Sequence, residues 1–158
     1  MRRRSPIPRS HRRVIVGSVQ REPFSLDAAL SRLAMAGPGA VASFTGLVRR
    51  DDGVEELLLE HYPAMTEATL HQLAEAAQAR FGLAGVVIVH RIGALVPGDP
   101  IVLVATAAAH RQAALDACAF LIDRLKTDAP FWKREQRGGV ARWVAPRAAD
   151  DQAADRWR

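Results

Sequence analysis

The chain has 158 residues, of which 49% are hydrophobic, so it can form one globular domain with a substantial core but is too short to predict two. Its formal net charge of +5 and its pI of about 10.6 suggest an anionic partner. However, residues 1–13 hold six of the 22 Lys and Arg residues and none of the 17 Asp and Glu residues, so residues 14–158 have a net charge of −1, which argues against a basic nucleic-acid-binding domain.

The N-terminal segment, MRRRSPIPRSHRR, has too little apolar surface to offset the entropy that it would lose on ordering. We therefore predict a disordered basic arm over residues 1–13 and a single domain over residues 14–158. The arm lacks the apolar stretch of a secretory signal, and no run approaches the roughly 18 apolar residues of a membrane span. We expect a cytoplasmic protein without a membrane partner. A nucleic-acid-binding protein that uses the Arg-rich arm is the alternative function.

The first part of the domain predicts a strand, a helix and a hairpin. A β-rich run over residues 14–19 is followed by a helical pattern in which Ser25 is the N-cap and Gly37 is the stop. Two extended segments, residues 39–48 and 54–62, flank an Asp-Gly pair that favours a tight turn. We therefore expect these two segments to pair as a hairpin.

The second part predicts two more helices among further strands. Apolar residues recur at three-and-four spacing over residues 66–81 and over residues 110–125, which is typical of amphipathic helices. Gly82 ends the first of these helices, and Pro130 prevents the second from continuing. The expected strands are residues 85–93, 101–109 and 139–144. Helices among hairpin-like strands favour an α+β fold with a mostly antiparallel sheet and about three helices.

One short segment, LKTDAPFWKRE over residues 125–135, carries two lysines and two large aromatics. In an extended stretch alternate side chains share a side, so Phe131 is expected beside Lys133 and Trp132 beside Arg134. A purely structural interpretation is open: Lys126 would complement the dipole of a helix C-terminus, and the other cations would be solvated.

Four further cations favour an anion pocket. His110 and Arg111 open a predicted helix, where the dipole and free backbone N–H groups attract anions and disfavour cations. Arg49 and Arg50 follow a strand, at the point where the chain enters a loop. We expect these groups to gather with the lysines around an anionic ligand. The histidines show no paired metal spacing, so no metal site is expected, and His61 and His90 are interpreted as structural residues with satisfied hydrogen bonds.

Five motifs together resemble one known family in order and spacing. They are GAVASFTGLVR (39–49), LEHYPAMTE (59–67), HRIGALVPGD (90–99), AAHR (108–111) and FLIDRLKTDAPFWKRE (120–135). The chain resembles the large catalytic subunit of molybdopterin synthase, with the last motif the most specific. The resemblance implies a hammerhead-like α/β fold and a sulfur transferase of molybdenum cofactor biosynthesis.

The resemblance also implies the reaction and the partners. Sulfur would pass from the thiocarboxylated C-terminal Gly-Gly of a small ubiquitin-like carrier subunit to cyclic pyranopterin monophosphate, giving molybdopterin. The chain would form a homodimer within a heterotetramer and would hold no permanently bound cofactor. Because the sulfur arrives on the carrier, no catalytic cysteine is required, and the single cysteine, Cys118, would be a packing residue of its helix.

The family's functional residues fall on matching positions of this chain. The catalytic pair would be Lys126 and Lys133. The substrate contacts would be Leu47, Val48, Arg49, His110, Arg111, Arg134 and Glu135. Guanidinium groups suit a phosphate, and ammonium groups can stabilise negative charge that develops during transfer. Leu47 departs from the family, which commonly has lysine at this position.

The neighbours of the lysines predict an altered basicity. A lysine beside other cations and beside Phe131 and Trp132 should have a lowered pKa, which would allow it to exchange a proton or to attack a carbonyl. The two aromatic side chains would also keep water from the sulfur intermediates.

Overall fold

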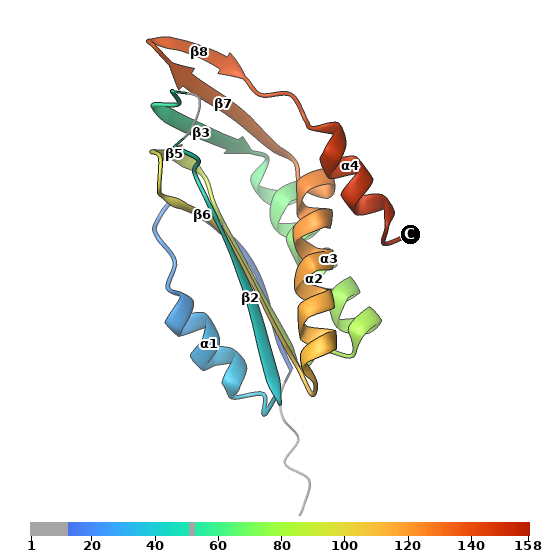
Figure 1. Cartoon of the computed structure of the whole chain (residues 1–158). Helices are drawn as coiled ribbons and strands as arrows, with labels where there is room; N and C mark the ends of the chain where they lie inside the picture. The colour runs from blue at the N-terminus through green and yellow to red at the C-terminus, as the bar shows by residue number, and fades with distance from the viewer. Residues whose placement is uncertain (1–12, 51–52) are drawn as a thin grey trace, which may run out of the picture.

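The structure, a computed structural model, describes residues 13–50 and 53–158 and contains two four-stranded sheets with four helices (Figure 1). The predicted basic arm lies outside the described residues except for the exposed Arg13. No helix in the described part of the chain is long and apolar enough to cross a membrane.

The strands divide between two sheets. Sheet A has the order β1 (Val14–Gln20), β4 (Gly85–Arg91), β6 (Pro100–Ala108), β2 (Ala40–Leu47). Sheet B has the order β5 (Gly93–Leu95), β3 (Glu56–His61), β7 (Phe131–Arg137), β8 (Val140–Trp143). Only the β1–β4 pair is parallel among the described strands, which confirms the α+β class and the mostly antiparallel pairing.

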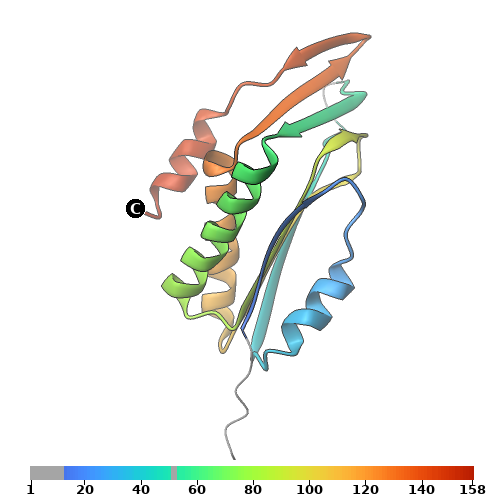
Figure 2. The same cartoon turned by 180° about the vertical axis from the view of Figure 1, so that it is seen from behind.

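The helices cover both faces of sheet A (Figures 1 and 2). They are α1 (Leu26–Ala34), α2 (Pro63–Phe81), α3 (Arg111–Asp128) and the short α4 (Ala148–Asp155). The main core forms where α2 and α3 pack on β4 and β6, and α1 closes the opposite face with Ala29 and Leu33. A strand covered on both faces needs an apolar run, and the Val-Val-Ile-Val of β4 supplies one. The charged tail forms α4, one helix more than the approximate number expected.

The predicted hairpin between residues 39–48 and 54–62 is wrong. β2 pairs with β6 in sheet A, whereas β3 pairs with β5 and β7 in sheet B. The Asp-Gly signal is local and says nothing of which strand offers the better partner. The nine-residue β6 matches the whole length of β2 and carries the apolar side chains of the core, so long-range packing decides the pairing.

Two helix boundaries also differ from prediction, and proline explains both. α2 begins at Pro63 rather than residue 66, because proline fits the first turn of a helix, where its missing N–H is not needed. α3 extends to Asp128 rather than residue 125, because Pro130 restricts only the residue directly before it, and Ala129 is extended with a ψ of 127°. The Ser25 cap of α1 is as predicted, since its side chain accepts a hydrogen bond from the N–H of Ala28 at 3.1 Å.

A third cluster joins the two sheets. Val48, just beyond β2, packs with Leu57 and Leu59 of β3 and with Leu95 of β5. Sheet B therefore stands at the end of sheet A where β2 ends and α3 finishes (Figure 1).

Candidate functional site

Lys133 lies on the face of sheet B that points into the molecule. Strand register places Lys133 opposite Leu59, a residue 1% exposed. Directly paired residues share a face, so Lys133 is partly covered by the protein. Burial lowers the pKa of Lys133, and the nearby Lys126 lowers it further. The predicted loss of basicity is therefore present at this lysine.

Lys126 reaches the same region from a different element. It lies in the last turn of α3, is exposed, and is close enough to disfavour the charged form of Lys133. The fold thus brings the two lysines together although a helix end and a proline separate them in sequence. These are also the only two lysines among the 22 Lys and Arg residues of the chain, a compositional signal that the motifs do not capture.

Phe131 and His90 form a ring stack beside the lysines. Their centroids are 3.7 Å apart with planes inclined by 18°. Burial lowers the pKa of His90 to about 4, so its ring is neutral at pH 7. Because Nδ1 lies 2.7 Å from the carbonyl oxygen of Arg91, the neutral ring carries its proton on Nδ1 and donates there. The predicted structural histidine at position 90 is therefore satisfied at Nδ1.

His61 differs from the prediction. It faces Phe131 across β3 and β7, with ring centroids 6.2 Å apart. Its Nδ1 is buried and has no hydrogen-bond partner among the described residues, so it is not a satisfied structural histidine. The register of β3 turns this ring toward the apolar face of Phe131, which offers no acceptor to a ring nitrogen.

The second aromatic, Trp132, shares a face with Arg134, as alternation predicts, and therefore does not shelter the lysines as expected. Alternation along β7 puts it on the other face of sheet B, where it is 42% exposed and packs edge-on against Tyr62 at 4.5 Å. Arg134 follows the same alternation, and its guanidinium lies over the ring of Trp143 at 5.7 Å. Of the two predicted aromatics, Phe131 alone shares the face of Lys133.

Charges from the end of the chain complete the surroundings of Lys133. Glu135, on the same face, favours its charged form, as does Asp150, whereas Arg147 disfavours it. The N–H of Val144 donates to the carbonyl oxygen of Lys133 at 2.8 Å, which holds the C-terminal segment beside β7. No sequence pattern marks Arg147 or Asp150, because only the fold brings the tail to this site.

The predicted contacts at the end of β2 have different surroundings. Leu47 is 55% exposed and sits at a register shift of the β2–β6 ladder. Val48 is buried, its N–H donates to Asp99 O at 2.9 Å, and its carbonyl accepts from Gly98 N at 2.8 Å. The side chain of Val48 is thus a packing group that fixes the exposed Arg49 after it.

His110 and Arg111 do not join the lysines within one chain. They lie at the N-terminal end of α3, and Lys126 lies in its last turn, fifteen residues further on. At 1.5 Å per residue these ends are about 22 Å apart. The expectation that all these cations line one pocket of a single chain is therefore wrong, because α3 is a continuous helix that separates them.

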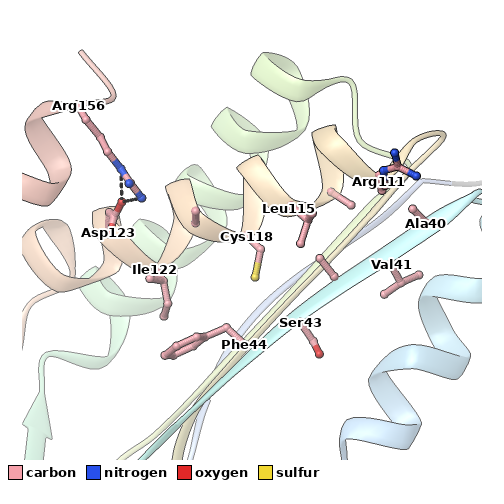
Figure 3. A pocket seen from close by; sticks show the side chains of 13 residues that line it. Ala40, Val41, Ser43, Phe44, Arg111, Leu115, Cys118, Ile122, Asp123 and Arg156 are labelled. Carbon is pink, nitrogen blue, oxygen red and sulfur yellow. Dashed lines mark hydrogen bonds and ion pairs between the residues drawn. The ribbon is translucent and has the colours of Figure 1, made fainter.

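A groove of about 440 Å³ runs between β2 and α3 (Figure 3). Apolar side chains from both elements line it, among them Val41, Phe44 and Leu115, with Arg111 at one end and the Asp123–Arg156 ion pair at the other. β2 is an edge strand of sheet A, so one side of its backbone is free of strand partners in the described chain. The groove is separate from the lysine cluster.

Comparisons with known proteins agree with one another. A family model described as MoaE protein matches residues 19–128. The chain is 49% identical over 142 residues to the molybdopterin synthase catalytic subunit of Cereibacter sphaeroides, covering 88% of this chain and 97% of that protein. Its fold matches a molybdopterin biosynthesis MoaE protein from Burkholderia ambifaria with a TM-score of 0.79 and 44% identity, covering 92% and 97% of the two chains.

A more distant structure shares the fold. It is the complex of subunits 1 and 2 of molybdopterin-converting factor from Helicobacter pylori, matched with a TM-score of 0.68 at 21% identity over 85% of this chain and 90% of that one.

Proposed function

The chain belongs to the MoaE family of molybdopterin synthase catalytic subunits, and we propose that Lys126 and Lys133 carry out its chemistry. It is an enzyme of molybdenum cofactor biosynthesis that forms molybdopterin. The observation that carries the proposal is the lowered pKa of Lys133 beside a second lysine from a different element. Perturbed basicity with a nearby charge is typical of catalytic groups.

The proposed substrates are both anions. They are cyclic pyranopterin monophosphate and the thiocarboxylated C-terminal Gly-Gly of a small carrier subunit, with the carrier as the sulfur source and no permanently bound cofactor. The two-subunit complex of the Helicobacter pylori relative supports a small partner subunit. Lys126, which is exposed, would steer the carboxyl end of the carrier. Lys133, which is partly buried, loses its proton more readily than an ordinary lysine and would exchange protons with the reacting groups.

Substrate binding would extend from the lysines to the arginines. Arg49 lies exposed at the junction of the two sheets and suits the phosphate of the pterin. Glu135 would orient Lys133, while Leu47 and Val48 would act through the backbone that presents Arg49. Arg134, on the other face of sheet B, remains a predicted contact that reaches the substrate only around the edge of the sheet.

A second copy would supply the missing cations. A two-fold axis that passes through the middle of α3 and the edge strand β2 would make the two copies of α3 run in opposite directions. Arg111 of one copy would then lie beside Lys126 of the other. The apolar groove and the free edge of β2 provide the self-complementary surface that such a homodimer requires. With one carrier per site, the assembly would be a heterotetramer.

The function is tested by supplying the full chain with the thiocarboxylated carrier and the cyclic precursor, and by measuring molybdopterin. We expect Lys126→Ala to nearly abolish turnover and Lys133→Ala also to damage it severely. The control is Arg158→Ala at the exposed last position, which should behave as the parent. Normal turnover in both lysine variants would refute the proposal.

The shared site is tested by complementation. Lys126→Ala and Arg111→Ala are each expected to be weakly active alone. Unfolded and refolded together, they form hybrid dimers with one intact site and one site that carries both changes, so about a quarter of the parent activity returns. Failure of the mixture to exceed its components would show that Arg111 acts in its own chain or not at all.

A further inference from the structure

The last residues of the chain fasten α4 to α3. One carboxylate oxygen, Asp123 Oδ2, accepts from Trp157 Nε1 at 2.7 Å and from Nε and Nη2 of Arg156 at 3.0 and 2.6 Å. The side chain of Asp123 is only 13% exposed, so these are partly shielded, charge-assisted bonds. Figure 3 shows the Asp123–Arg156 pair at the end of the groove.

The same residues also fasten α4 to α2. The indole of Trp157 packs edge-on against Phe81 of α2 and Phe120 of α3, with ring centroids 6.1 and 5.6 Å away. Arg80 places its guanidinium 5.5 Å from the indole centroid and donates from Nη1 to the carbonyl oxygen of Trp157 at 2.6 Å. We call Asp123, Arg156 and Trp157 the C-terminal latch.

Apart from its packing against α3, α4 has no buried residue of its own to anchor it. A helix of eight residues also gains little from its own hydrogen bonds in water. Its first turn carries Asp150, and Arg147 is its N-cap; both act electrostatically on Lys133. Because eight helical residues span about 12 Å, fixing the C-terminal end of α4 fixes the position of its first turn.

We infer that Asp123 and Trp157 are positioning residues for Lys133: they latch α4 across α2 and α3 and thereby hold Arg147 and Asp150 beside the lysine. Two attachments confine the C-terminal segment, the bond from Val144 N to Lys133 O at its start and the latch at its end. Loss of the latch would leave the bond at Val144 in place and would release Arg147 and Asp150, which lie between the two attachments. The catalytic consequence rests on the proposed role of Lys133, but the placement of the charges does not.

The experiment uses the composition of the chain, which has only two lysines. An amine-selective reagent applied to the full-length protein across pH, followed by mass spectrometry of peptides, gives a separate labelling midpoint for Lys126 and Lys133. The variants are Asp123→Asn, Trp157→Phe and Trp157→Ala. The matched control is Arg158→Ala, an 83% exposed residue whose ion pair stays within the end of α4.

In Asp123→Asn and Trp157→Ala we expect the Lys133 midpoint to move upward, because burial is the largest cause of its lowered pKa and the freed segment no longer contributes to that cover. The losses of Arg147, which lowers the pKa, and of Asp150, which raises it, oppose each other. Lys126 serves as the internal reference for labelling. Trp157→Phe keeps the ring packing but loses the Nε1 donor and should lie between parent and alanine. In turnover, kcat should fall about tenfold to 100-fold with little change in KM, the cost of a small displacement at a catalytic group.

Midpoints and kcat that match those of Arg158→Ala in both Asp123→Asn and Trp157→Ala would overturn the inference. Circular dichroism and molar mass in solution establish that each variant folds and keeps its assembly, since Asp123 also borders the groove. If Trp157→Ala does not fold, Asp123→Asn decides alone. A failure of the proposed function would appear instead as normal turnover of Lys133→Ala, whatever the labelling midpoints show.

Discussion

β4 and β7 each have seven residues and a neighbouring strand on either side, yet the two strands differ in side-chain burial at every position. All seven residues of β4 are buried, and none of β7 is. β4 is apolar until its last two residues, whereas β7 reads Phe-Trp-Lys-Arg-Glu-Gln-Arg. One strand stabilises the domain, and the other presents charged groups that do not contribute to a core.

A ring stack joins the two strands. His90, near the end of β4, stacks on Phe131, the first residue of β7. The core strand therefore sets the position from which β7 begins, and alternation along β7 then points Lys133 inward. A partly buried lysine costs stability, so we attribute its presence to chemistry rather than to packing.

The largest effect that separates the two strands is expected from Lys133→Met, which keeps the length of the side chain and removes the charge. Turnover should fall at least about 100-fold, because a charged group that acts in the transition state is lost. The free energy of unfolding should stay or rise, since the folded state disfavours the charged form. Activity assays and denaturant unfolding measure both, with Arg142→Met on the neighbouring strand as the control; a large loss of stability would contradict the comparison.

Ile88→Ala in β4 is expected to give the opposite result. Ile88 is fully buried in the main core, so its truncation should cost about 2–5 kcal/mol of stability. The turnover of the molecules that remain folded should change by less than about twofold. Val140→Ala, at a 53% exposed position, should cost less than about 0.5 kcal/mol in the same unfolding experiment.

His90→Phe tests the contact between the strands by its pH dependence. The folded pKa of about 4 lies below the ordinary 6.5, so protonation favours the unfolded chain and the parent loses stability as pH falls from 6.5 towards 4. Phenylalanine keeps the stack without this loss. The free energy of unfolding of the variant minus that of the parent should therefore increase by roughly 3 kcal/mol between pH 7 and pH 4. Parallel stability curves would show that the ring at position 90 is not buried as the structure describes.

A small effect on activity is also expected from Trp132→Ala. The side chain lies on the face of sheet B away from Lys133, so turnover should change by less than about threefold, with a modest loss of stability from its contact with Tyr62. Phe131→Ala, on the lysine face, is the comparison variant and should be the more damaging of the two. Equal losses of activity would restore the original idea that both aromatics shelter the site.

Much of the local structure follows from the residues themselves. The cap at Ser25, the stop at Gly82, the buried run of β4 and the face shared by Phe131 and Lys133 all arise from interactions within a few residues of the chain. The family and the two lysines could also be predicted from the sequence, because LKTDAPFWKRE is a motif of consecutive residues.

By itself, then, the sequence determined the fold class, most elements, the family and the side that Lys133 shares with Phe131. Only the tertiary structure decided that β2 and β3 belong to different sheets and that the C-terminal tail brings Arg147 and Asp150 to Lys133. The reason is physical: caps, turns and alternation depend on neighbouring residues, whereas strand partners and the meeting of distant charges depend on which packing of the whole chain buries the most apolar surface.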